Sequence, residues 1–112
     1  MAYSKFRNVK VVVDGIKFDS KAEYHRYTVL SLLQRSKVIT KLQLQVKYLL
    51  TPILTKDDGK RERATHYVAD FVYWEDNKLV VEDVKGGKST PGFIIKRKLM
   101  LEKHGITVKE IR

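Results

Sequence analysis

Cysteine is absent from this chain, and histidine, proline and tryptophan are scarce. There are no Cys, three His, two Pro and one Trp in 112 residues. Without Cys there is no disulfide, no thiolate zinc site and no cysteine nucleophile. Three His, at positions 25, 66 and 104, do not favour an all-histidine metal site. A cysteine-free composition suits a reducing compartment, so we expect a cytoplasmic location.

Long apolar runs are also missing. No stretch approaches the ~20 apolar residues of a membrane span, and the first residues, MAYSKFRNVKVVVDG, lack the pattern of a signal peptide. We therefore expect no membrane association. Hydrophobic residues make up 43% and charged residues 32% of the chain, enough apolar surface for one folded core. The length predicts a single domain over residues 1–112.

Acidic residues are few beside basic ones. Lys and Arg number 23 against 13 Asp and Glu, giving a net charge of +10, and such a surface predicts a polyanionic partner. Residues 1–56 carry eleven basic and three acidic groups, whereas residues 57–112 carry twelve and ten. Carboxylates repel phosphate, so either a divalent metal gives this acidic group a role or it merely solvates the surface.

The order of expected elements defines the fold class. Asp14-Gly15 between β-branched runs predicts a hairpin over residues 9–18. Ser20 followed by Glu23 forms a capping box, which predicts a helix to about residue 35. Periodicity then predicts the following elements: strands at 39–50, 63–74 and 79–85, a helix at 92–104 and a strand at 106–111. The prediction is an α/β domain with an N-terminal arm and hairpin (1–18) and an α-β-β-β-α-β core (19–112), its mixed sheet flanked by two helices.

The most informative residues for chemistry are Asp70, Asp83 and Lys85. Strand alternation places Asp83 and Lys85 on one face and Glu82 on the other. The expected turn at 75–78 makes the two strands antiparallel neighbours and brings Asp70 opposite the Asp83 region. Two adjacent carboxylates repel unless a positive charge lies between them, and carboxylate oxygens are the ligands that Mg²⁺ prefers. The alternative is a surface charge pair between Asp83 and Lys85.

Four segments carry a resemblance to a known family. They read FDSKAEYHRY, YVADFVYW, VVEDVKG and TPGFIIKRKLM, and they span about residues 18–101. Together they resemble the PD-(D/E)XK nuclease superfamily, whose core is α-β-β-β-α-β, and within it the small phage-encoded, resolvase-like branch. The resemblance implies a Mg²⁺-dependent endonuclease, with Mn²⁺ able to substitute, that cuts branched DNA. It further implies a Holliday junction resolvase, a homodimer, 5′-phosphate and 3′-hydroxyl products, and the host-cell cytoplasm if the gene is phage-encoded.

The resemblance assigns roles to single residues. Asp70 takes the place of the first acid, Asp83 the (D/E) position and Lys85 the lysine position. Asp70, Asp83 and the carbonyl of Val84 would hold the metal. Lys85 would orient or deprotonate the attacking water, or neutralise the developing charge. Glu23 matches the acid that resolvase-like members place in the first helix, where it would complete the metal site.

Two of these assignments stay open in the sequence. Glu82 directly precedes Asp83, so either carboxylate could be the ligand, although strand alternation favours Asp83. Glu23 occupies the third helical position, where capping alone explains a glutamate. The chain also departs from the family pattern at Ala69, where the motif has proline.

A basic segment marks the expected DNA contact. Between Lys85 and Lys98 there are five basic residues and no acid, and Gly86-Gly87 would let a phosphate backbone approach closely. Ser89 lies near the expected helix N-terminus, where anions are favoured. The residues predicted to bind DNA are Lys88, Ser89, Lys96, Lys98 and Arg26, and Gln45 is a further candidate for the site. The alternative is a flexible loop with solvated helix faces.

Two other functions fit the same sequence. One is a less selective nuclease that cuts flaps, single strands or duplexes. The other is a non-catalytic, basic nucleic-acid-binding module in which the acids are structural. If the protein is a dimer, the N-terminal hairpin and an exposed strand edge are the candidate interfaces.

Overall fold

A mixed four-stranded sheet forms the core of the protein, seen here in a computed structural model that describes residues 10–13 and 15–112. Its strand order is β3-β6-β7-β8. The strands are β3 (Thr40–Thr51), β6 (Thr65–Glu75), β7 (Lys78–Val84) and β8 (Lys109–Ile111). The first three are antiparallel, and β8 runs parallel to β7. With the helices added, the core reads α-β-β-β-α-β, so the predicted fold class is confirmed.

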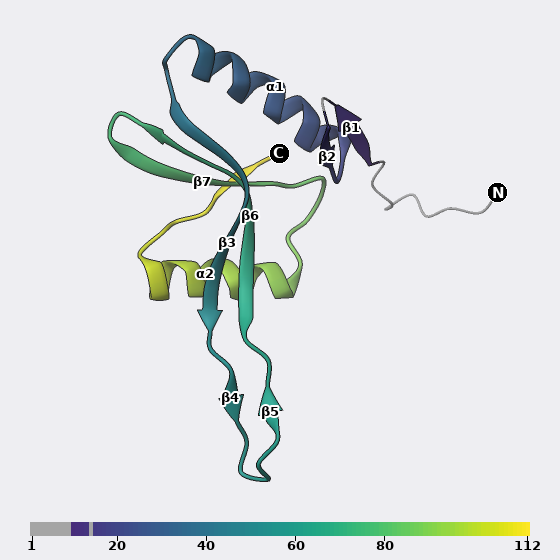
Figure 1. The fold of residues 1–112 in the computed structure, drawn as a ribbon, viewed down its shortest axis with the longest axis vertical. Helices are drawn as coiled ribbons and strands as arrows, with labels where there is room; N and C mark the ends of the chain where they lie inside the picture. Colours follow the sequence, from purple (N-terminus) through teal and green to yellow (C-terminus); the bar gives the residue numbers. More distant parts are fainter. Residues whose placement is uncertain (1–9, 14) are drawn as a thin grey trace, which may run out of the picture.

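Two helices cover opposite faces of this sheet, α1 (Lys21–Arg35) and α2 (Pro91–His104) (Figure 1). Both begin at a hydroxyl cap, because Ser20 and Thr90 each accept a hydrogen bond of 3.1 Å from the backbone three residues on. α2 ends at Gly105, whose φ of 66° is the left-handed conformation expected at a C-cap. Among the described residues, no helix is long and apolar enough to cross a membrane.

The N-terminal hairpin lies against α1. Its strands are β1 (Val11–Val13) and β2 (Ile16–Phe18), paired antiparallel. Phe18 is buried and packs against Tyr24 and Tyr27 of α1, with ring centroids 5.6 and 5.0 Å apart. The predicted hairpin is confirmed. Asp14 of its turn, and residues 1–9 of the expected N-terminal segment, lie outside the described residues.

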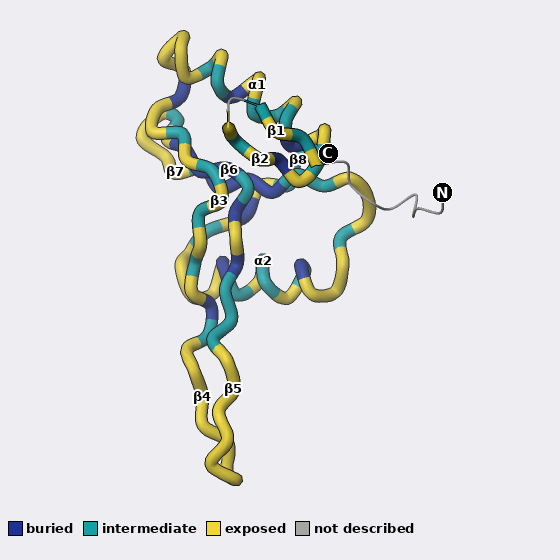
Figure 2. Tube along the Cα trace, turned by 45° about the vertical axis from the view of Figure 1, so that its right-hand side comes forward, coloured by how far each residue is buried: buried dark blue, intermediate teal, exposed yellow. Residues whose placement is uncertain are grey.

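A second hairpin projects from the far end of β3 and β6. Residues 52–64, which we call the arm, contain the short strands β4 (Leu54–Thr55) and β5 (Arg61–Glu62). Figure 2 shows the arm exposed along nearly its whole length. The radius of gyration is 16.4 Å, against roughly 13 Å for a compact domain of this size. The polar residues of 56–60 predict the turn at its tip, but not its projection away from the core.

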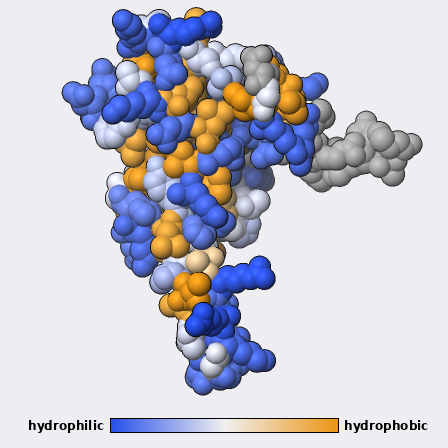
Figure 3. Space-filling model, viewed as in Figure 1, coloured by the Kyte–Doolittle hydropathy of each residue, from blue (hydrophilic) through white to orange (hydrophobic). Residues whose placement is uncertain are grey.

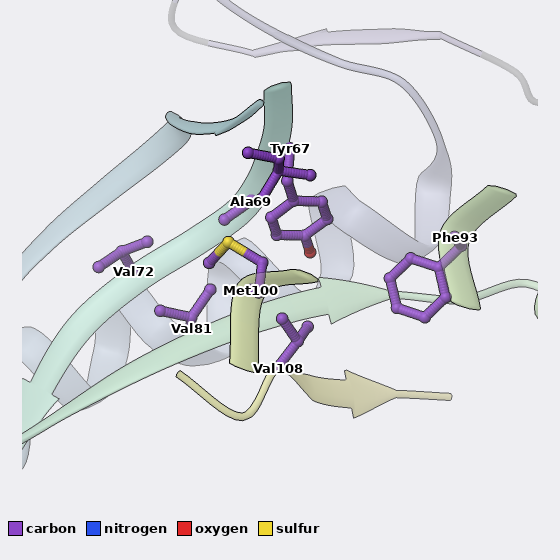
Figure 4. Close-up of a cluster of buried hydrophobic side chains, with 8 residues drawn as sticks. Tyr67, Ala69, Val72, Val81, Phe93, Met100 and Val108 are labelled. Atoms are coloured by element: carbon purple, nitrogen blue, oxygen red, sulfur yellow. The ribbon is translucent and has the colours of Figure 1, made fainter. Parts of the chain in front are cut away.

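Alternation along β6 shifts by one residue at Asp70. Ala69 and Val72, three positions apart, both pack in the buried cluster under α2, where Met100 points between Ala69 and Val81 (Figure 4). Phe71 instead packs in the cluster under α1. A regular strand would keep residues two apart on one face. Up to Ala69 the buried side chains of β6 lie on the face under α2, whereas beyond Asp70 side chains on both faces are buried.

Candidate active site

The strands β6 and β7 separate at Asp70. Their ladder pairs Phe71 with Glu82 as its last step, so Asp70 stands opposite Asp83, as the turn at 75–78 predicts. Asp70 Oδ2 accepts a hydrogen bond of 2.7 Å from the Val84 N–H and thus replaces a backbone acceptor. The N–H and C=O of a strand residue point to the same side, so the Val84 carbonyl is directed toward Asp70 as well.

Asp83 is almost buried and is held from two sides. It is 7% exposed, its Oδ1 accepts a hydrogen bond of 2.8 Å from the Tyr67 hydroxyl, and its Oδ2 lies 2.8 Å from Lys85 Nζ. Lys85 Nζ also lies 3.3 Å from the centroid of the Phe93 ring. The ion pair and the cation–π contact both stabilise a positive charge on Lys85. Burial, and then the hydrogen bond to Asp83, raise the pKa of Tyr67, which keeps this phenol a proton donor.

Glu82 points to the opposite face and is fully occupied. Its side chain is 0% exposed and accepts hydrogen bonds from Arg26 Nε (2.8 Å) and Nη2 (2.6 Å), as well as from the Tyr73 hydroxyl. The structure therefore places Asp83, and not Glu82, in the cleft. The sequence interpretation of Arg26 as a DNA contact is revised, because its guanidinium is committed to Glu82, and this hydrogen bond raises the pKa of Arg26.

Glu23 serves the helix cap with its backbone and the cleft with its side chain. Its N–H donates to Ser20 Oγ, while its carboxylate accepts a hydrogen bond of 3.0 Å from Gln45 Nε2. Burial raises the pKa of Glu23 to about 7, and the negative charges of Asp70 and Asp19 contribute in the same direction. The backbone of Asp19 lowers it in part. The carboxyl group of Glu23 thus belongs to the charge balance of the cleft.

Left-handed backbone at Gln45 brings this amide to the site. Its φ is 55°, an unusual value for a residue other than glycine. By the β3–β6 register Gln45 lies between Leu44 and Val46, opposite Asp70. Its side chain hydrogen-bonds Glu23, and a hydrogen bond from Gln45 partly opposes the rise in the pKa of Asp70 that burial causes. The sequence pattern offers Gln45 as a candidate by alternation, but nothing in it indicates the left-handed backbone.

Burial disfavours negative charge on the carboxyl groups of Glu23 and Asp70 in the cleft. Burial raises the pKa of Asp70, and the charge of Asp83 raises it further, while the Val84 N–H opposes the shift. A cation would relieve this unfavourable charge, and an all-oxygen donor set suits Mg²⁺ or Mn²⁺. Within residues 10–13 and 15–112, no group of three or more His, Cys, Asp or Glu side chains is already gathered around one metal position. Asp83 is instead paired with Lys85 and Tyr67.

These groups open onto one cleft of about 470 Å³ between the start of α1 and the ends of the strands. It is lined by Asp19, Ser20, Lys21, Ala22, Glu23, Asp70, Asp83, Val84, Lys85 and Gly86. All four residues predicted to be catalytic are therefore brought together. Sequence reasoning missed Asp19 and Lys21, and their only signal is their position beside the capping box. Tyr67 and Phe93, which contact Asp83 and Lys85, were likewise not among the predicted site residues.

The basic residues of the predicted DNA contact are placed less uniformly. Lys88 is exposed in the loop before α2. Ser89 donates a hydrogen bond of 3.0 Å to Glu110 Oε1, so its hydroxyl already has a partner. Lys98 lies beside Ile95 in a separate hollow on the outer face of α2. Neither Lys96 nor Lys98 lines the cleft, so the structure does not bring these two predicted DNA contacts together with the carboxylates.

Fold and cleft together define an α/β protein with a carboxylate–lysine site where two antiparallel strands separate. The chain belongs to the family described as "Protein of unknown function (DUF1064)", whose model matches residues 3–111. No curated protein matches the chain, and no solved structure matches it.

Proposed function

We propose that this protein is a Mg²⁺-dependent, structure-selective DNA endonuclease, and specifically a Holliday junction resolvase. One observation carries the proposal: Glu23, Asp70, Asp83 and Lys85 meet in one open cleft, although they come from three different elements. The raised pKa values of Glu23 and Asp70 support it, because burial and the neighbouring carboxylates disfavour their ionised forms and a bound cation would offset both effects. The net charge of +10 supports a polyanionic substrate.

The residues present fit a divalent metal. Asp70 and Asp83 would hold it, with Glu23 and the Val84 carbonyl as further oxygen donors. When bound, such a metal supplies Lewis-acid polarisation of the phosphodiester and lowers the pKa of a coordinated water. Its arrival would also neutralise the repulsion between the cleft carboxylates.

Side chains of the chain itself would position the substrate and balance charge. Lys21, in the first turn of α1, lines the cleft and offers a cation to the incoming phosphate. Asp83 and Phe93 position the ammonium group of Lys85 at the cleft, where it would stabilise the negative charge growing on the phosphoryl oxygens. Attack of water on phosphorus forms one P–O bond and breaks the bond to the 3′ oxygen. The products are a 5′-phosphate and a 3′-hydroxyl, to which the proton passes.

Paired nicks at a junction call for a twofold dimer. Of the two interfaces suggested by the sequence, the edge of β3 is poorly suited to pairing. The Leu42 N–H donates a hydrogen bond of 2.8 Å to Gln34 Oε1, and the Leu49 carbonyl oxygen lies 2.7 Å from His104 Nε2. Lys41, like Gln45, is left-handed, which interrupts the edge further. These contacts favour the N-terminal hairpin as the dimer interface.

The test is cleavage of a labelled four-way junction beside linear duplex, flap and single strand, each with Mg²⁺, Mn²⁺ or EDTA. We expect symmetric, metal-dependent nicks in the junction alone, and no nicks with Asp83→Asn, which should still bind DNA. Cleavage of every substrate would favour the less selective nuclease. Tight binding without cleavage under any metal condition would favour the nucleic-acid-binding module.

A further inference from the structure

The arm, residues 52–64, contributes no residue to the cleft described above. It continues β3 and β6 beyond the last pair, Thr51 with Thr65, and its tip turns at Asp57–Gly59. About six residues on each side, at ~3.3 Å per residue, carry the tip roughly 20 Å from the sheet. An isolated two-stranded ribbon is marginally stable in water, so a bound partner would stabilise this one.

The tip of the arm carries an excess of positive charge. Its cations are Lys56, Lys60, Arg61 and Arg63, and its acids are Asp57, Asp58 and Glu62. Glu62 Oε1 lies 3.5 Å from Lys56 Nζ, and Asp58 Oδ1 accepts the Lys60 N–H at 2.9 Å. Only Glu62 forms an ion pair with a cation of the arm, because the hydrogen bond of Asp58 is to a backbone N–H. Lys60, Arg61 and Arg63 are exposed beside Asp57 and Asp58, and these three cations suit phosphates.

Apolar side chains lie between this cationic tip and the sheet. Ile53 and Leu54 are 58% and 54% exposed, and Figure 3 shows hydrophobic surface on the arm next to its hydrophilic tip. Exposed aliphatic residues on a basic ribbon are suited to contact with the faces of base pairs, as in proteins that insert apolar wedges into DNA. A branch point offers such faces, because stacking between base pairs is interrupted there.

The arm is tied directly to the cleft. Val68 lies two residues before Asp70 on β6, the strand that joins the arm to the cleft. Its partner on β3 is Lys47, and Leu49 follows two residues later. Val68 and Leu49 are 42% and 48% exposed, so their face of the sheet is open between the cleft and the arm. A ligand held by the arm would therefore lie along a surface that leads to the carboxylates.

We propose that the arm binds branched DNA, with its cationic tip on phosphates and Ile53 and Leu54 at the exposed base pairs of the branch. A two-stranded ribbon also has the right width to enter a major groove. This inference rests on the proposed function and adds the element that selects a branch over a linear duplex. A second copy of the chain is the competing occupant of the apolar residues, and the experiment below separates the two.

Binding of a labelled four-way junction and of a linear duplex is measured in EDTA over a range of NaCl concentrations. The test variant is Lys60→Gln/Arg61→Gln/Arg63→Gln. The matched control, Arg35→Gln/Lys37→Gln/Lys78→Gln, removes the same charge from exposed positions at the other end of the sheet. Loss of three phosphate contacts lowers the slope of log K against log[salt] by about 2.7. We expect that change for the arm variant and a much smaller one for the control; equal slopes for the two variants would overturn the proposal.

A second pair of variants tests the apolar residues and the selectivity. Ile53→Ser/Leu54→Ser should reduce junction affinity at least several-fold more than duplex affinity, at unchanged mass in sedimentation. A change from dimer to monomer with unaltered junction binding would make the arm a protein contact and refute the proposal. Replacing residues 52–64 by Asn-Gly, a two-residue hairpin turn, should abolish the preference for the junction. Far-UV circular dichroism and thermal unfolding would confirm that each variant is folded.

Failure of the arm proposal and failure of the nuclease proposal look different. The binding measurements contain no metal and no cleavage step, so they report on the arm alone. If the wild type cleaves DNA in a metal-dependent way but the arm variants bind DNA as the wild type does, the nuclease proposal stands and the arm proposal is wrong. A reduced salt slope without cleavage under any metal condition would leave the arm and remove the nuclease.

Discussion

Neutralising Glu23 should stabilise the metal-free protein. Glu23 is 5% exposed, and burial together with Asp70 and Asp19 raises its pKa from 4.5 to about 7. At about 1.4 kcal/mol per pH unit, this shift corresponds to roughly 3 kcal/mol against the folded state once Glu23 is fully ionised. In Glu23→Gln the amide oxygen can still accept the hydrogen bond from Gln45. Its N–H can donate to Asp70, as the O–H of the protonated acid does. We expect the variant to be about 1–3 kcal/mol more stable at pH 8.

The pH dependence gives this prediction its sign. A carboxyl whose folded pKa is raised contributes stability below pH 4.5 and loses it as pH rises toward 7. The difference between wild type and Glu23→Gln should therefore be small at pH 4.5 and grow up to about pH 7. Urea unfolding in EDTA at several pH values measures it, with Asp76→Asn in the exposed β6–β7 turn as the control. A variant that is less stable than wild type at pH 8 would show that ionised Glu23 does not destabilise the folded protein.

Three further results are expected. Mg²⁺ at 100 times its Kd should stabilise the wild type by about 2.7 kcal/mol in thermal unfolding, and Asp83→Asn should lose most of this gain; equal gains in both would place the metal elsewhere. Arg26→Met should cost about 3–5 kcal/mol in urea unfolding, because it leaves the buried Glu82 without its cationic partner and with only the Tyr73 hydroxyl, and a cost below 1 kcal/mol would contradict the buried pair. Tyr67→Phe should weaken Mn²⁺ binding about tenfold in titration calorimetry by freeing Asp83, whereas unchanged affinity would make the hydroxyl a packing group only.

Local signals were sufficient for the elements of the core. Ser20 and Thr90 cap their helices through hydroxyl groups, and Gly105 ends α2, as each residue type predicts. The turn at 75–78 fixes the register, and with it the meeting of Asp70 and Asp83, because a tight turn leaves no freedom in pairing. These features depend on neighbours in sequence, so a single sequence can reveal them.

Features that depend on distant partners were not accessible in the same way. Arg26 reads as a solvent-facing helix residue until Glu82, 56 positions away, is placed beneath it. Tyr67 reads as a packing residue because alternation shows its burial but not its hydroxyl partner. The slip at Asp70 and the left-handed Gln45 break the strict alternation from which strand faces are inferred. The arm escaped prediction because a polar turn does not report how far it stands from the core.

We propose that the carboxylates of this cleft support metal-dependent cleavage of branched DNA. The most direct measurement is the single-turnover rate of nicking of a four-way junction in Mg²⁺, for wild type, Asp70→Asn and Asp76→Asn. Both substitutions remove one negative charge, but only Asp70 lies in the cleft. We expect cleavage by wild type and by Asp76→Asn, and none by Asp70→Asn, which should still bind the junction. Equal cleavage by Asp70→Asn, or wild-type cleavage that persists in EDTA, would contradict this proposal.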